Sequence, residues 1–110
     1  MNAWFEELGR RLAAAARARG TAIDPPELSP AVGAQLLELA RVAAHTQERR
    51  FAPLASYMAG AAAERVRAAG GDASPEALAA LIREVREGLE AEAEGGGEGG
   101  ERERPATGPT

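Results

Sequence analysis

Side chains that could bind a ligand or take part in catalysis lie mainly on one predicted helix and the turn after it. Charged and polar side chains recur there at spacings of three and four, which places them on one strip of a helix: Glu38, Arg41, His45, Glu48 and Arg49. Two interpretations stay open. The strip is either a solvated face whose ion pairs contribute about 0.2–0.5 kcal/mol each, or a recognition patch for an anionic ligand or a partner carboxylate. In the second interpretation Arg41, His45 and Arg49 make the contacts, with Tyr57 nearby.

The same residues do not predict a catalytic or metal site. His45 is the only histidine and the chain has no cysteine, whereas zinc requires three or four protein ligands. Ser56 and Tyr57 lie beyond the next turn, so His45 has no neighbouring nucleophile to activate. We therefore expect no enzyme activity, no bound metal and no cofactor.

Four helices must position the polar strip, and the composition favours them. Alanine, leucine, arginine and glutamate dominate, while β-branched and aromatic residues are scarce. Helix starts are indicated by Asn2, by the two Ser-Pro pairs at 29–30 and 74–75, and by Pro53. Helix ends are indicated by Gly20 and by glycines 70–71. The predicted fold is all-α, a compact four-helix bundle-like domain, with helices at about 3–19, 30–47, 53–69 and 75–93.

Apolar residues predict how these helices pack. The apolar arc of helix 30–47 exceeds half its circumference, so we expect this helix to be central. Helix 75–93 has the cleanest apolar stripe, formed by Leu78, Leu81, Ile82, Val85 and Leu89. Trp4 is expected to anchor the core, Tyr57 to bury its ring, and Gly60 to mark a close approach between helices.

The remaining chain and the net charge exclude several classes of protein. Residues 94–110 are rich in glycine and glutamate and lack apolar side chains able to stabilise a fold, which predicts a disordered tail after a domain at 1–93. The net charge is −4 with a pI near 5.1 and no basic stripe, so no nucleic-acid partner is expected. No apolar run approaches the ~18 residues that span a bilayer, and no signal peptide precedes the first helix. We expect a cytoplasmic protein with no membrane partner.

A sequence motif resembles a known family. The motif begins with Leu-Ala-Arg-Val-Ala-Ala-His at 39–45 and continues through Arg49, Pro53 and Tyr57 to Gly60. With Trp4 and Leu8 before it, this pattern resembles a small bacterial helical domain of unknown function, found alone or fused to molybdenum-cofactor guanylyltransferases. The resemblance implies that His45, Arg49, Pro53, Tyr57 and Gly60 are signature positions. The chain departs from the family pattern at Arg50-Phe51, where Pro-Ala is usual.

These observations favour one functional class and leave two alternatives. We expect a non-enzymatic accessory or protein-interaction module associated with molybdenum cofactor (molybdopterin guanine dinucleotide) biosynthesis. Its partner is expected to be a molybdenum-cofactor nucleotidyltransferase or another protein, and the chain itself a monomer or weak homodimer. The alternatives are a helical domain that binds small anionic ligands or nucleotides, and a structural dimerisation module.

Overall fold

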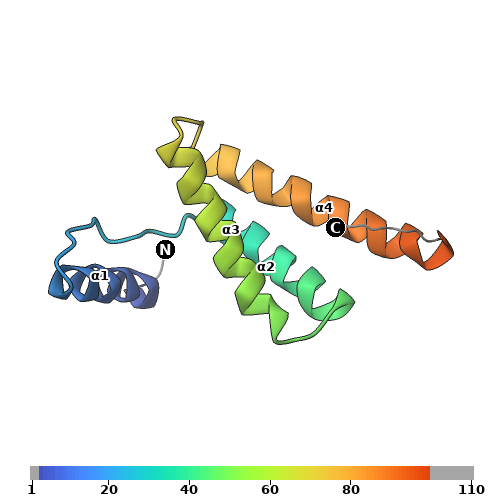
Figure 1. The fold of residues 1–110 in the computed structure, drawn as a ribbon, viewed down its shortest axis with the longest axis horizontal. Helices are drawn as coiled ribbons and strands as arrows, with labels where there is room; N and C mark the ends of the chain where they lie inside the picture. Colours follow the sequence, from blue (N-terminus) through green and yellow to red (C-terminus); the bar gives the residue numbers. More distant parts are fainter. Residues whose placement is uncertain (1–2, 100–110) are drawn as a thin grey trace.

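The computed structural model describes residues 3–99, with side chains to residue 95, and all regular structure in this part of the chain is α-helical. The helices are α1 (Ala3–Ala18), α2 (Pro30–Thr46), α3 (Phe51–Ala68) and α4 (Pro75–Gly99) (Figure 1). The predicted all-α fold of four helices is confirmed.

Local capping explains where the helices begin and end. The Ser29 hydroxyl accepts a hydrogen bond from the Val32 amide at 3.1 Å, and the Ser74 hydroxyl accepts one from the Ala77 amide at 3.2 Å. Each bond satisfies an amide that has no partner inside the helix. Gly20 and Gly70, just beyond α1 and α3, have φ angles of 91° and 84°. Only glycine adopts this left-handed conformation without strain, so both predicted ends are confirmed.

Two helix boundaries differ from the prediction. α3 begins at Phe51, two residues before Pro53, because a proline in the first turn lacks only an amide that would have no intrahelical partner. α4 continues to Gly99, six residues past the predicted end at 93. Alanine and glutamate at 91–94 favour helix, and backbone hydrogen bonds within the helix extend it. The rest of the predicted disordered tail, residues 100–110, lies outside the described residues.

α2 is the central helix, as predicted. It packs against both α3 and α4, whereas α1 forms no extended packing with another helix in the described residues (Figure 1). Leu39 and Val42 of α2 are buried together with three residues of α4: Leu78, Ala79 and Ile82. α2 and α4 run in the same direction, because residues 35 and 41 of α2 bond to residues 86 and 90 of α4. α3 lies between them in the chain and runs back along α2, so that α4 can start at the same end as α2.

α1 packs against its own connector, residues 19–29. Gly9 is buried in the middle of α1, and a Cβ added there would lie 2.5 Å from the carbonyl oxygen of Pro26. Ala13, one turn later, is buried as well. The expectation that Trp4 anchors the core is wrong: Trp4 is 67% exposed, with Phe5 edge-on at 5.1 Å. α1 covers its small-residue face with the connector and leaves its bulky stripe outside the helix core.

α3 uses small side chains to approach α2. The half-buried residues of α3 lie mainly on one face, at Ala52, Ala55, Ser56, Ala59, Ala63 and Val66. Gly60 is exposed and a Cβ there would meet nothing within 4 Å, so the expectation that Gly60 marks a close approach is wrong. Tyr57 is 77% exposed, and its predicted ring burial is wrong too. Alanines allow the close approach, and Gly60 and Tyr57 point away from it.

Candidate functional site

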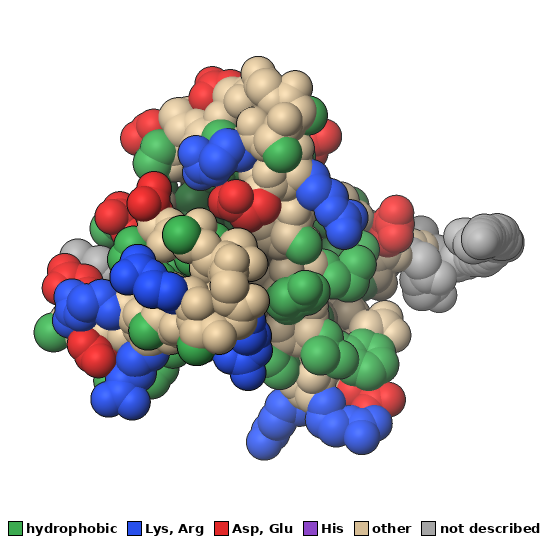
Figure 2. Space-filling view, turned by 60° about the vertical axis from the view of Figure 1, so that its left-hand side comes forward, with side chains coloured by type: hydrophobic (Ala, Val, Ile, Leu, Met, Phe, Trp, Pro, Cys, Tyr) green, Lys and Arg blue, Asp and Glu red, His purple; other side chains and the backbone are tan. Residues whose placement is uncertain are grey.

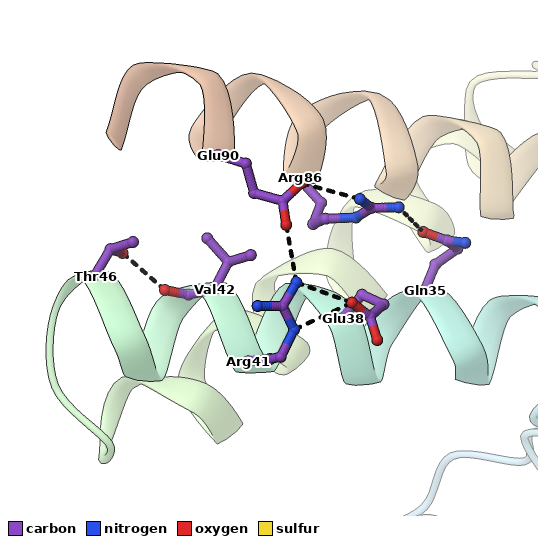
Figure 3. Close-up of polar contacts among 7 residues, drawn as sticks. All are labelled: Gln35, Glu38, Arg41, Val42, Thr46, Arg86 and Glu90. Carbon is purple, nitrogen blue, oxygen red and sulfur yellow. Dashed lines mark hydrogen bonds and ion pairs between the residues drawn. The ribbon is translucent and has the colours of Figure 1, made fainter. Parts of the chain in front are cut away.

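A polar network joins α2 to α4 along their line of contact (Figure 3). Arg41 donates hydrogen bonds to Glu38 at 3.0 Å and to Glu90 at 2.8 Å. Arg86 donates to the other carboxylate oxygen of Glu90 at 3.0 Å and to the side-chain oxygen of Gln35 at 3.2 Å. We call these five residues the α2–α4 polar seam.

The seam is electrically balanced, since it contains two arginines and two glutamates. Hydrogen bonds from Arg86 and then Arg41 hold the pKa of Glu90 below its usual value. Hydrogen bonds to Glu38 and Glu90 raise the pKa of Arg41. The side chain of Arg86 is 16% exposed, and its Nε is buried with no hydrogen-bond partner among the described residues. The seam clamps two helices together and leaves little positive charge for a ligand.

The four residues predicted to form a recognition patch lie on α2, on α3 and in the turn between them. Arg41 belongs to the seam, while His45 is exposed in the last turn of α2 and Arg49 is exposed in the turn before α3. Tyr57 is exposed on the second turn of α3. No hydrogen bond or ion pair joins any two of these four within residues 3–99.

Tyr57 instead belongs to a group of large exposed side chains on α3. Phe51, Leu54, Tyr57 and Met58 follow spacings of three and four, which places them on one side of the helix. Leu54 is 60% exposed and Met58 is 71% exposed. On the right of Figure 2, hydrophobic side chains gather in a column that ends at basic and acidic side chains below. We call these four residues the outer face of α3.

The sequence contains a signal for this face that the prediction missed. α3 is apolar almost all round, with alanines on one side and large side chains on the other. Small side chains allow α3 to lie close to α2, so the alanine side of α3 packs against α2 and the large side chains face away from it. The two contacts of the seam that join α2 to α4, Arg41–Glu90 and Arg86–Gln35, carry no such signal, since each joins residues about 50 positions apart.

The described residues contain neither a cluster of metal ligands nor a membrane-spanning helix. Within residues 3–99, no group of three or more histidine, cysteine, aspartate or glutamate side chains could hold a metal ion. No described helix is both long and apolar enough to cross a bilayer. The exposed apolar side chains of α3 and the arginines beside them are available for contact with another surface.

Comparison with known proteins identifies the family. The model of DUF6457, a domain of unknown function, matches residues 1–97. The chain belongs to the DUF6457 family. Neither a curated protein nor a solved structure matches the chain. The predicted membership of a helical domain family of unknown function is confirmed, and the association of this DUF6457 domain with molybdenum-cofactor enzymes stays a prediction.

Proposed function

We propose that this DUF6457 domain is a non-enzymatic accessory module that binds another protein through the outer face of α3. The observation that carries the proposal is the exposure of Leu54, Tyr57 and Met58 side by side on one helix. Water contact with so much apolar side chain is unfavourable, and burial against a partner removes it.

The size of the face supports a binding role. The exposed fractions of its four side chains correspond to about 500 Å² of accessible surface, within the 300–600 Å² typical of the largest apolar patch on a soluble monomer. Such patches are often functional. Among the residues whose side chains are described, the buried hydrophobic ones are Ala13, Leu39, Val42, Leu78, Ala79 and Ile82, so the outer face is large relative to the fold that presents it.

The residue types also suit a protein interface. Tyrosine, phenylalanine, methionine and arginine are enriched in the cores of protein interfaces, and the face combines the first three with Arg49 at its start. Arg50 is held by Glu48 at 2.7 Å, whereas Arg49 forms no ion pair among the described residues. Arg49 can therefore add a directed contact to a carboxylate at the edge of the apolar face.

The partner proposed is a molybdenum-cofactor guanylyltransferase. Its support is the resemblance of residues 39–60 to a domain that accompanies such enzymes, and part of that motif lies on the proposed binding surface. Tyr57 belongs to the outer face, and Arg49 lies exposed in the turn just before α3. A domain that accompanies an enzyme needs a surface for it, and the outer face supplies one.

Binding of the full chain to a purified molybdenum-cofactor guanylyltransferase, measured by calorimetry, tests the proposal. Changing Tyr57→Ala and Met58→Ala together should weaken binding by about 30-fold or more, as expected for central interface side chains. Arg83→Ala is the matched control, because Arg83 is exposed on α4 and joins no ion pair in the described residues. Absence of binding by the wild-type chain, or equal weakening by the control, contradicts the proposal.

A further inference from the structure

A second apolar surface lies on α1. Trp4, Leu8 and Leu12 recur at spacings of four, and they are 67%, 38% and 49% exposed. A hollow lined by Trp4, Glu7, Leu8 and Arg11 opens on this side of the helix. Gly9 and Ala13 are buried on another side of the helix, and Pro26 of the connector lies against Gly9. α1 is thus an amphipathic helix whose bulky stripe is directed away from its own connector.

A third apolar surface lies on α4. The predicted stripe of α4 divides in two: Leu78 and Ile82 are buried, whereas Leu81, Val85 and Leu89 are between 36% and 51% exposed. The exposed three recur at spacings of four, so they form a straight row beside the contact with α2. α3 does not cover this row, since α3 packs along α2 and not along α4 in the described residues.

We propose that the α1 stripe of one copy of this chain packs on the exposed α4 row of a second copy, and reciprocally, to form a symmetric dimer. The two surfaces have matching form, because each is a row of large side chains four residues apart on a helix. Such rows interdigitate when two helices pack. Reciprocal exchange covers both surfaces on both copies at once, as a closed two-fold interface requires.

Charge favours the same pairing. Residues 3–19 carry four arginines and two glutamates, a net charge of +2. Residues 75–95 carry six glutamates and two arginines, a net charge of −4. Opposite net charges on the two helices attract across an interface and select this pairing over α1 against α1 or α4 against α4.

The area is sufficient for a dimer. The exposed fractions of Trp4, Phe5, Leu8 and Leu12, together with those of the α4 row, correspond to about 600 Å² of apolar side chain in each copy. If all of this surface is covered, a reciprocal pair buries at most about 1,200 Å², which is the lower limit of stable specific interfaces. An interface at that limit dissociates on dilution, so the dimer is weak and its population depends on concentration.

The connector directs α1 to another copy rather than to its own α4. Pro26 is seated on Gly9, and Leu28 lies against Gly33 of α2. Only residue 27 separates these two anchored points, and one residue spans about 3.3–3.6 Å. α1 lies at one end of the long axis of the molecule and the C-terminal half of α4 at the other (Figure 1). Docking within one chain would have to break the Gly9 or Leu28 contacts, whereas docking onto a second copy keeps both.

Sedimentation velocity of the full chain over a concentration series tests the proposal. The wild-type chain should show a monomer–dimer equilibrium, and the emission of its single tryptophan should shift to shorter wavelength as the dimer forms and covers Trp4. Leu12→Glu on α1 and Val85→Glu on α4 should each raise the dimer Kd at least about tenfold, because each dimer would bury two unpaired carboxylates. Both residues are exposed in one copy, so circular dichroism should show unchanged helix content.

Leu37→Glu is the matched control, since Leu37 is 73% exposed on α2 and belongs to neither surface. It should leave the dimer Kd unchanged. A chain that stays monomeric at millimolar concentration overturns the proposal. So does a dimer that Leu12→Glu and Val85→Glu do not weaken, or a tryptophan shift that is independent of concentration, which would indicate docking within one chain.

Discussion

Two glycines at equivalent positions in two helices should respond oppositely to the same substitution. Gly60 lies in the middle of α3 with open space around it, and Gly9 lies in the middle of α1 against the connector. Alanine is favoured over glycine inside a helix by about 0.5–1 kcal/mol. Gly60→Ala should gain this amount in full, which for a domain of this size raises Tm by about 2–8 °C.

Gly9→Ala brings the same gain in helix propensity, but a steric clash lowers the free energy of unfolding by more than this gain. Its Cβ would lie 2.5 Å from the Pro26 carbonyl oxygen, a separation that requires the connector backbone to move. Forcing an extra carbon into a packed site costs about 1–3 kcal/mol. The gain offsets only part of this cost, so we expect a net loss of about 0–2 kcal/mol. The connector amides should also lose protection against hydrogen exchange, because the seat of Pro26 on α1 is lost.

Urea unfolding followed by circular dichroism measures both changes, and the double variant should show their sum because the sites share no partner. Hydrogen exchange locates the effect of Gly9→Ala. If Gly9→Ala stabilises the chain as much as Gly60→Ala does, the connector is not seated on α1. The anchoring of α1 would then lose its support.

Three further variants probe the core, a cap and the polar seam. Ile82→Ala removes one of the few buried large side chains and should lower the free energy of unfolding by about 2–4 kcal/mol, measured by urea titration. Ser29→Ala removes the hydroxyl that caps α2 and should cost about 1 kcal/mol in the same assay. Glu90 has a pKa held below its usual 4.5 by Arg86 and Arg41, so its contribution is present above that value and is lost as the pH falls through the lowered pKa. In wild type the urea midpoint of unfolding should fall between about pH 5 and 3, and Glu90→Gln should make this fall smaller. If the midpoint of Glu90→Gln falls as steeply as that of wild type, Glu90 does not stabilise the fold through the polar seam.

The sequence predicted the features that depend on short-range chemistry. Ser29 and Gly20 mark helix ends because capping and left-handed backbone involve only neighbouring residues. The breadth of the apolar arc on α2 likewise predicted its central place. Pairings across the fold were out of reach, since nothing near Arg41 in the sequence indicates that Glu90 lies beside it.

Large apolar side chains produced the clearest errors. Trp4 and Tyr57 were expected inside because burial of an aromatic ring is favourable, yet both are exposed. Hydrophobicity predicts that a side chain leaves water and does not say whether its neighbour belongs to the same chain. α3 brings its alanines to α2, which leaves Tyr57 outside and turns an expected core residue into a candidate contact.

Binding of a partner protein to the outer face of α3 can be observed directly by methyl NMR. The chain has two methionines, Met1 and Met58, so labelling methionine methyl groups gives one reporter on the face and one control at the N-terminus. On titration with a molybdenum-cofactor guanylyltransferase, the Met58 signal should shift or broaden while the Met1 signal changes little. Binding that leaves the Met58 signal unchanged would contradict a partner site on the outer face of α3.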